Sequence, residues 1–232
     1  MTKNKLYCVI PARGGSKRIK NKNIIIFNKK PLIYYSINVA KKSNLFKKII
    51  VSTDSDKIKY LSEKFGAIVP FKRQKNISND KSLSKEVLID VIKKLKIKDD
   101  YIFFIYPTAP LLEKNHLLKA WKQIKKSKAD CLIATKEYES NPLRSLIVDK
   151  NTGYLKFKFK KYQKKNSQEL PILFQDSGSF YIFKIKTLMK SKTFIPKKTI
   201  AFNLGKYESI DINDVEDLKF SKFLYKYRKI IN

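Results

Sequence analysis

Apolar and polar positions along the chain alternate in a way that predicts strands and helices in turn. Continuous apolar runs predict buried strands at 6–11, 48–52, 67–70, 101–106 and 131–134. Apolar residues three or four positions apart predict helices that begin at Pro31, after Thr53, at Ser84 and near residue 117. Strands and helices that alternate at this length predict an α/β fold with a mostly parallel, doubly wound sheet.

The alternation lapses after about residue 136. Segment 137–171 is polar and carries short alternating stretches such as Leu155, Phe157 and Phe159, which predict a small antiparallel insert. The earlier pattern then resumes with strands at 179–184 and 199–204 and a closing helix at 214–227. We therefore expect one domain over 1–232, with 137–171 inserted into it.

Polar residues and a glycine mark the expected ends of two helices. Thr53 and Asp56 have the spacing of a capping box, although Asp is a weaker partner there than Glu. Gly66 is suited to end the same helix. Ser84 is suited to cap the next helix, so its position alone does not require a role in a binding site.

Composition is that of a globular protein without a membrane span. Of the 232 residues 43% are apolar, and no run reaches the ~18 apolar residues that a spanning helix needs. The apolar run Leu6–Ile10 is too short for the core of a signal peptide, so we expect a cytoplasmic protein. Cys8 and Cys131 lie in apolar runs, and we expect both to be buried free thiols.

A formal net charge of +32 raises the possibility of a nucleic-acid or membrane partner. Of 52 basic residues, however, only five are arginine, the residue that usually reads bases and phosphates. The lysines are spread along the whole chain, as expected of a solvated surface. We therefore expect no nucleic-acid and no membrane partner, and a basic nucleic-acid-binding protein is kept as a distant alternative.

The polar loop after the first strand has the composition of a phosphate site. Gly14 and Gly15 lack side chains, so their N–H groups could approach a phosphate closely, and Ser16 adds a hydroxyl. Positive charge comes from Arg13, Lys17, Arg18, Lys20 and Lys22. Neither the P-loop pattern nor the dinucleotide pattern G-x-G-x-x-G fits this loop. In parallel sheets ligands bind at the carboxyl ends of strands, where this loop begins.

The loop sequence IPARGGSKRIKNKNI resembles the signature of the CMP-sugar synthetases that act on sialic acids and related nonulosonic acids. The similarity runs nearly from end to end. Further matching segments are Val51–Asp54, Pro70–Arg73 with Ser78, Asp80 and Ser84, Tyr106–Pro110, and Ser209–Leu218. The resemblance implies a Rossmann-like sheet of the nucleotide-diphospho-sugar transferase type.

Two later segments point to one branch of that family. Ser167–Pro171 and Gln175–Tyr181 resemble S-Q-D-L-P and Q-D-A-G-Q-F-Y of the pseudaminic acid cytidylyltransferases. The resemblance implies transfer of CMP from CTP to the anomeric hydroxyl of a nonulosonic acid, most closely pseudaminic acid, with release of pyrophosphate. N-acetylneuraminic or legionaminic acid as acceptor, a sugar nucleotidyltransferase that uses UTP or GTP, and an inactive paralogue remain alternatives.

The resemblance also implies roles for individual residues. Arg13 and Lys22 match the positions that bind the phosphates and stabilise charge on the α-phosphate, and we expect them to be catalytic. Nucleotide-binding positions match Ala12, Arg13, Gly14, Gly15, Ser16, Lys17, Asn23, Arg73, Ser84, Thr108 and Ala109. Gln168, Gln175 and Asp176 are expected to face the acceptor sugar. No general base and no catalytic role for His116, the only histidine, emerges.

Mg²⁺ is the cofactor that the family implies. Asp211 matches one carboxylate ligand, but the second ligand position holds Asn213, which can offer only an uncharged oxygen. Asp214 is an alternative second ligand, and Asp217 is as well explained by the first turn of the closing helix. In the family the segment matching 137–171 forms a dimerisation element, which implies a homodimer.

Overall fold

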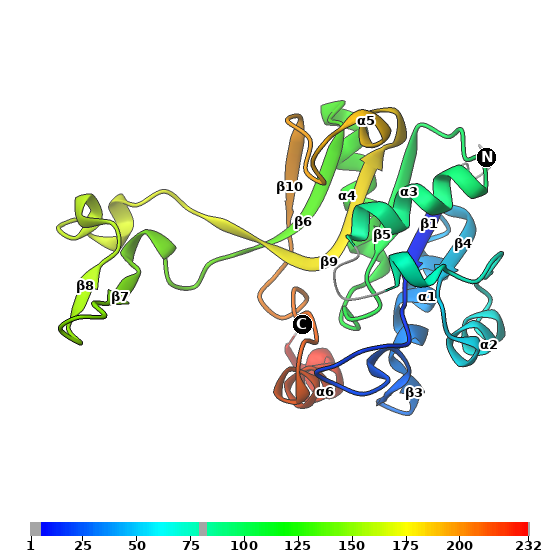
Figure 1. The fold of residues 1–232 in the computed structure, drawn as a ribbon, viewed down its shortest axis with the longest axis horizontal. Coiled ribbons are helices and arrows are strands. Elements are labelled where there is room, and N and C mark those ends of the chain that lie inside the picture. The colour runs from blue at the N-terminus through cyan, green and yellow to red at the C-terminus, as the bar shows by residue number, and fades with distance from the viewer. Residues whose placement is uncertain (1–5, 79–82, 232) are drawn as a thin grey trace.

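A computed structural model describes residues 6–78 and 83–231, and its centre is a mostly parallel sheet. Within the described residues, six strands form this sheet in the order β10-β6-β9-β5-β1-β4 (Figure 1). Their bounds are β1 Leu6–Pro11, β4 Phe46–Ser52, β5 Tyr101–Ile105, β6 Cys131–Glu137, β9 Phe174–Lys184 and β10 Thr199–Asn203. Only β9 is antiparallel to its neighbours, β5 and β6. The predicted α/β class is confirmed.

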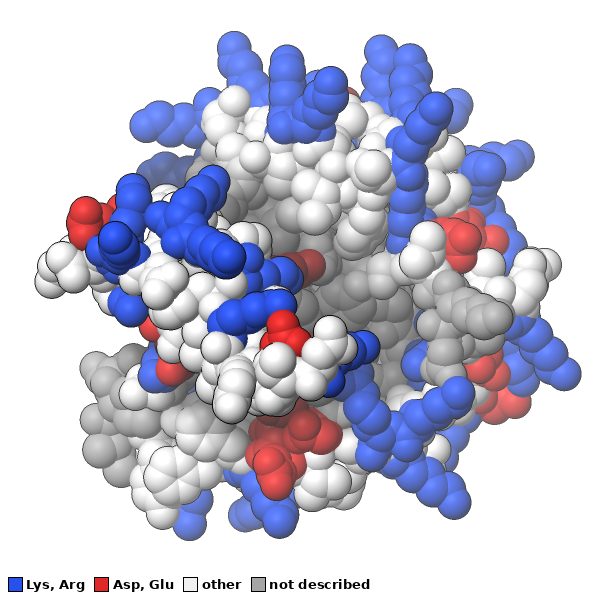
Figure 2. All heavy atoms as spheres, turned by 60° about the vertical axis from the view of Figure 1, so that its left-hand side comes forward, with Lys and Arg blue, Asp and Glu red and all other residues white. Residues whose placement is uncertain are grey.

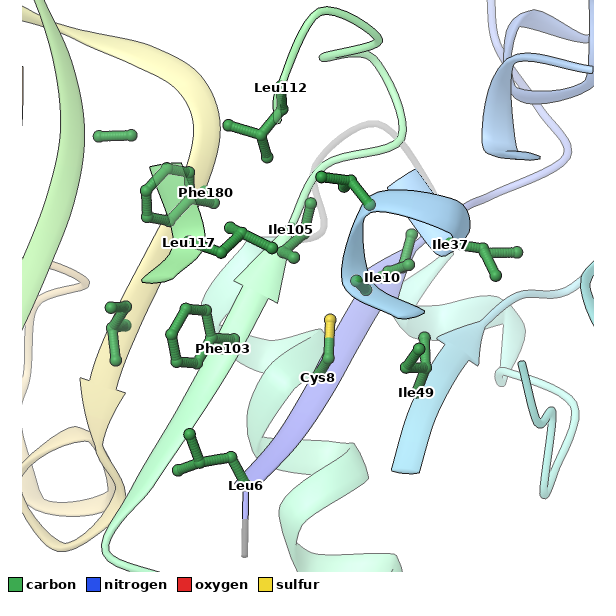
Figure 3. Close-up of a cluster of buried hydrophobic side chains, with 14 of the residues drawn as sticks. Leu6, Cys8, Ile10, Ile37, Ile49, Phe103, Ile105, Leu112, Leu117 and Phe180 are labelled. Carbon is green, nitrogen blue, oxygen red and sulfur yellow. The ribbon is translucent and has the colours of Figure 1, made fainter. Parts of the chain in front are cut away.

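Helices cover both faces of the sheet, as a doubly wound fold requires. Their bounds are α1 Leu32–Ser43, α2 Asp56–Lys64, α3 Ser84–Lys94, α4 Lys114–Ser127, α5 Ile185–Lys190 and α6 Val215–Ile231. Alternate residues of β5 enter two different cores: Phe103 packs with α1 and α4, and Phe104 packs with α3 and α5. Figure 3 shows the first of these cores, with Cys8 and Ile10 of β1 beside Phe103.

Three local predictions were wrong. The apolar run 67–70 forms only an isolated parallel bridge, Ile68 to Ile50 on the edge strand β4, because Pro70 lacks the N–H that a ladder needs. Helix α2 is capped by Ser55, whose hydroxyl accepts from the Ile58 N–H, and not by Thr53. Helix α3 has Leu83 at its N-cap, so Ser84 is its first helical residue and its side chain is available for other contacts.

A third apolar cluster attaches the loop after β1 to the C-terminal helix. Ile19, Phe27 and Leu32 pack against Ile212 and Leu218. The strands β2 (Ile26–Phe27) and β3 (Lys30–Pro31) form a small hairpin in this region, after the 3-10 helix η1 (Lys22–Ile24). The cluster therefore brings the segment after the first strand into contact with the segment that leads into the C-terminal helix.

Residues between β6 and β9 form an arm that extends away from the sheet (Figure 1). Its strands β7 (Leu146–Val148) and β8 (Leu155–Phe157) pair antiparallel, as the alternating pattern predicted. The short 3-10 helices η3 (Pro142–Arg144), η4 (Lys160–Tyr162) and η5 (Ser167–Glu169) surround this hairpin, whereas η2 (Lys75–Ile77) lies in the body.

The two cysteines follow the sequence expectation, and two features of the surface can be described beside them. No helix in the described part of the chain is long and apolar enough to cross a membrane. Cys8 and Cys131 are free and buried, and burial raises the pKa of both thiols, that of Cys131 to about 12. Figure 2 shows Lys and Arg side chains spread around the molecule, and they do not gather in a single patch on that face.

Candidate active site

Two cavities adjoin each other at the edge of the sheet where the parallel strands end. The first cavity, of about 520 Å³, lies between the loop after β1, the start of α3 and the turn after β5. The second cavity, of about 1200 Å³, lies between β9, the loop after β10 and the base of the arm. Asp211 and Asn213 line both cavities, so they form a shared wall.

Most of the predicted nucleotide and metal residues converge on the first cavity. Those that line it are Arg13, Ser16, Lys17, Lys22, Asn23, Arg73, Ser84, Thr108, Asp211 and Asn213. Ala12, Gly14, Gly15 and Ala109 do not line it. Ala12 and Ala109 are buried, and the Ala12 N–H donates to the Ser52 carbonyl at 2.9 Å, so they support the cavity from behind.

Gly14 was expected to offer its N–H to a phosphate, and the structure shows a contact of this group within the chain. Its N–H donates to Asp54 Oδ1 at 2.8 Å, so this N–H is already used within the chain. A Cβ at Gly14 would lie 3.1 Å from the Ser55 Cβ, closer than nearly all such contacts. Glycine therefore allows the close approach of two loops, and a Cβ here would require Ser55 to shift by a few tenths of an ångström. The surroundings of Gly15 are open, with nothing within 4 Å of a Cβ built there.

One internal contact fixes the backbone of the basic loop, and a second contact lies behind the loop at the end of β4. The Asn23 amide is buried and donates to the Arg13 carbonyl at 2.9 Å. Arg73 is buried behind the loop, where its guanidinium donates to the Ser52 carbonyl and its Nε has no partner. Burial lowers the pKa of Arg73 to about 10, although the Asp54 carboxylate opposes this. Arg73 still carries a positive charge at neutral pH and adds to the potential of the cavity.

Lys22 and Asp211 place opposite charges in the shared part of the site. The Lys22 ammonium donates to the Ile212 carbonyl at 2.8 Å. Burial lowers the pKa of Lys22, and the Asp211 carboxylate opposes the decrease. Burial raises the pKa of Asp211, while the Thr108 hydroxyl, Lys22 and the Asn213 amide act in the opposite direction. Each group thus stabilises the charged form of the other.

Asn213 contacts charged neighbours on both sides. Its amide nitrogen donates to Asp211 Oδ2 at 3.0 Å, and its oxygen accepts from Arg18 at 2.9 Å. In this arrangement Asn213 supports the Asp211 carboxylate, and its oxygen is directed to Arg18. At the start of α6 the Asp214 N–H donates to Asp217 Oδ2 at 3.3 Å, and the Asp217 N–H donates to Asp214 Oδ1 at 2.9 Å. Both side chains therefore cap this helix.

The turn after β5 is tied to the Asp211 segment. The Ile212 N–H donates to the Thr108 carbonyl at 3.0 Å, and the Ser36 hydroxyl donates to the Tyr106 carbonyl at 2.9 Å. The turn therefore fixes the position of Asp211 relative to the other residues that line the first cavity. His116 lies away from both cavities, where its Nδ1 accepts from the Glu113 N–H at 3.1 Å at the start of α4.

The predicted sugar residues are only partly brought together. Gln175 and Asp176, near the start of β9, line the second cavity. Gln168 lies in η5 on the arm, is exposed and lines neither cavity. Asp80 lies outside the described residues.

Sequence reasoning named Arg18 only as a source of positive charge in the loop, and it assigned no role to Tyr106, Gly178 and Tyr181, which also shape this region. Arg18 and Tyr106 line the first cavity. Gly178 has φ +63°, and a Cβ there would lie 3.1 Å from Asp211 Oδ2. The sequence signal for Arg18 was the scarcity of arginine in a chain whose basic residues are nearly all lysine. Nothing in the sequence indicates that Gly178 lies against Asp211.

Asp211 is suited to hold a divalent cation. Its Oδ1 is buried and has no hydrogen-bond partner, although it lies beside a cavity lined by phosphate-binding side-chain types. Hard cations such as Mg²⁺ bind through one or two carboxylates together with substrate phosphates. Among the described residues no group of three or more His, Cys, Asp or Glu side chains could hold a metal, so phosphate oxygens would have to complete its coordination.

Comparison with known proteins agrees with the geometry. The cytidylyltransferase family model matches residues 7–230. The pseudaminic acid cytidylyltransferase of Campylobacter jejuni is 37% identical over 94% of this chain and 95% of its own length. The CMP-N,N′-diacetyllegionaminic acid synthase of Campylobacter jejuni is 32% identical over 97% of each chain.

A solved structure supports the same fold. CMP:2-keto-3-deoxy-manno-octonic acid synthetase, determined with CTP, aligns with a TM-score of 0.73 at 14% identity, covering 97% of this chain and 99% of that one. At that identity the likeness concerns the fold. The family match, by contrast, spans nearly the whole sequence. This chain therefore belongs to the cytidylyltransferase family.

Proposed function

We propose that the protein transfers CMP from CTP to the anomeric hydroxyl of a nonulosonic acid, with pseudaminic acid as the preferred acceptor. The observation that carries this proposal is the pair of adjoining cavities, one basic and one lined by Asp176 and Gln175, that share Asp211. The name of the relative at 37% identity supports the choice of acceptor.

The first cavity suits the triphosphate. Arg13, Lys17, Arg18 and Lys22 would neutralise its charge, and a guanidinium can hold two phosphate oxygens at once. Preorganised cations that stabilise developing charge are the main source of catalysis in phosphoryl transfer. Lys22 is fixed through Ile212, so it needs little reorganisation when the substrate binds.

Asp211 would hold Mg²⁺ together with phosphate oxygens. The cation would supply further charge neutralisation for the phosphates during the displacement. Asn213 would orient the Asp211 carboxylate through its amide nitrogen, and Arg18 would remain bonded to the Asn213 oxygen.

The second cavity would receive the acid sugar. Attack of the anomeric hydroxyl oxygen on the α-phosphorus forms the new P–O bond, the bond from the α-phosphorus to the α–β bridging oxygen breaks to release pyrophosphate, and the hydroxyl proton passes to water. Asp176 would accept hydrogen bonds from sugar hydroxyl or amide groups. The cytoplasm, where nucleoside triphosphates are made, is the compartment that this reaction implies.

We also propose a homodimer in which the arm contacts a second copy. Apolar side chains of the hairpin are exposed on the single chain, including Val148 at 61% and Leu155 at 65%. Burial of such side chains against a partner would stabilise the pair. The exposed Gln168 on the same arm would then lie near the partner and not near its own second cavity.

The decisive test is pyrophosphate release from CTP and Mg²⁺ with pseudaminic, legionaminic or N-acetylneuraminic acid added separately. Release that is fastest with pseudaminic acid is the expected result. Faster release with another of the acids would retain the reaction and overturn the acceptor. A folded protein that binds CTP but releases no pyrophosphate with any of the acids would overturn the proposed function.

A further inference from the structure

Two tyrosines, the half-buried Tyr106 and the buried Tyr181, connect a residue of the first cavity with a residue of the second. Tyr106 follows β5 and lines the first cavity, and Tyr181 lies on the neighbouring strand β9. Their rings meet edge to face, with centroids 5.9 Å apart and planes at 70°. Neither residue has a role in the assignments above.

The Tyr181 hydroxyl donates to Asp176 Oδ2, a residue of the second cavity. The other carboxylate oxygen, Oδ1, accepts from the Gly178 N–H at 2.9 Å. Each oxygen of Asp176 is therefore held by one donor from β9, although the side chain itself is exposed to the cavity. A carboxylate oxygen accepts more than one hydrogen bond, so both oxygens keep capacity for a ligand.

Tyr106 makes the equivalent contact on the side of the first cavity. Its hydroxyl hydrogen-bonds the Ser84 hydroxyl at the first turn of α3. Ser84 and Tyr106 both line the first cavity. A continuous set of contacts thus runs from Ser84, through the two aromatic rings, to Asp176 in the second cavity.

Packing alone does not explain the two hydroxyl groups. Behind the tyrosines, the same aromatic cluster is built from phenylalanines: Phe104, Phe183 and Phe194. Phenylalanine at position 181 would fill nearly the same volume, and it would avoid burying a polar group. Buried hydroxyl groups are stabilised only when they have partners, so the partners of these two are the informative feature.

Both phenols are neutral over the pH range of an assay. Burial raises the pKa of Tyr106 to about 12, with the Ser84 and Tyr181 hydroxyls acting in the opposite direction. Burial, Tyr106 and Asp176 raise the pKa of Tyr181 further. A neutral phenol keeps its proton available for the Asp176 carboxylate.

We infer that Tyr181 is a positioning residue for the acceptor sugar, acting by fixing the carboxylate of Asp176, and that Tyr106 braces it against Ser84 of the nucleotide cavity. This inference rests on the proposed function for the identity of the acceptor. Its physical basis is preorganisation: a carboxylate held in one orientation binds hydrogen-bond donors with a smaller loss of entropy.

The test is steady-state kinetics of Tyr181→Phe, with CTP and with the acid that the wild type uses best. The KM for the sugar should rise about tenfold, which corresponds to the loss of one hydrogen bond to a charged group. The kcat and the KM for CTP should stay within about threefold of wild type, because the first cavity is unchanged. Tyr101→Phe is the matched control, since the Tyr101 hydroxyl on β5 is buried but donates to the Ala129 carbonyl at 3.0 Å.

A double-mutant cycle separates positioning from general destabilisation. In an Asp176→Ala background, Tyr181→Phe should leave the KM for the sugar unchanged, because the group it positions is absent. A further tenfold rise in that background, or an unchanged KM in the single variant, would overturn the inference.

If Tyr181→Phe does not fold, the KM for the sugar is measured in Tyr106→Phe instead. A rise of about threefold is expected, and no rise would overturn the bracing role. Absence of turnover in the wild type would instead count against the proposed function.

Discussion

The two cavities differ in how completely a single chain builds them. In the first cavity, side chains such as Asn23, Lys22 and Arg73 are bonded to the backbone of neighbouring loops. The second cavity is larger and is lined in part by exposed aromatic side chains, Tyr207 at 41% and Phe220 at 51%. The nucleotide site is therefore preorganised within the chain, whereas the acceptor site opens toward the base of the arm.

This difference has an energetic consequence. Preorganised groups lose little freedom when a ligand binds, so the first cavity should bind CTP without help from the acceptor. Exposed aromatic groups around the second cavity are stabilised when a ligand or a second copy covers them. Binding of the sugar should therefore be the step that depends on more than the folded body of one chain.

The largest effect is expected at the wall that the cavities share. Asp211→Ala should lower kcat/KM about 1000-fold, because it removes the carboxylate that faces both cavities and that is proposed to hold the cation. Pyrophosphate release measures the effect. Asp214→Ala is the control, since it removes only a cap of α6 and should lower the free energy of unfolding by about 1 kcal/mol. Equal activity of the two variants would contradict the role given to Asp211.

A smaller effect is expected within the first cavity alone. Lys22→Met should lower kcat about 100-fold and change the KM for the sugar little, because its ammonium acts on charge that develops at the phosphates. Lys20→Met is a matched control two residues away, exposed and outside the lining. A similar loss in both variants would mean that general loop charge, and not Lys22, supplies the catalysis.

Gly178 on β9 lines the second cavity and not the first, although it lies against Asp211 of the shared wall. Gly178→Ala places a methyl group 3.1 Å from Asp211 Oδ2 and strains a backbone with φ +63°. The KM for the sugar should rise about tenfold, with CTP binding measured by calorimetry nearly unchanged. Gly153→Ala in the arm has a similar φ of +75° with nothing nearby, so it reports the strain alone. A CTP affinity that falls together with the sugar affinity would show that the cavities are not separable.

The smallest effect on the folded body is expected from the arm. Val148→Asp combined with Leu155→Asp should give a monomer in analytical ultracentrifugation, because charges would replace apolar contacts between copies. Exposed substitutions change the free energy of unfolding by only about 0.5 kcal/mol, so the Tm should move little. Lys150→Asp on the same arm controls for added negative charge. A wild-type protein that sediments as a monomer would contradict the proposed dimer.

The sequence predicted the order of elements well and their edges less well. Long apolar runs such as Tyr101–Ile105 are buried on both faces, so their pattern is strong. The run 67–70 is shorter and ends in Pro70, which lacks the N–H of a ladder, so it forms a bridge to the edge strand β4 instead of a strand. An apolar run therefore overestimates a strand where proline removes a ladder hydrogen bond.

The candidate site shows the same limit. Resemblance located Asp211, Lys22 and Arg73, and the fold brings them to one cavity. Gly14 was expected to offer its N–H to a phosphate, yet that N–H bonds to Asp54, forty residues away in the sequence. Loop composition indicates which groups are present, but not which of them the chain itself already uses.

By itself, the sequence determined the α/β class, the basic loop and the family, because each depends on local pattern or on residues close together in the chain. Only the tertiary structure decided that Gly178 lies against Asp211, that Tyr181 holds Asp176, and that Gln168 lies apart on the arm. The physical reason is that side-chain contacts form between segments joined by strand pairing and packing. Their partners are fixed by three-dimensional proximity and not by spacing along the chain.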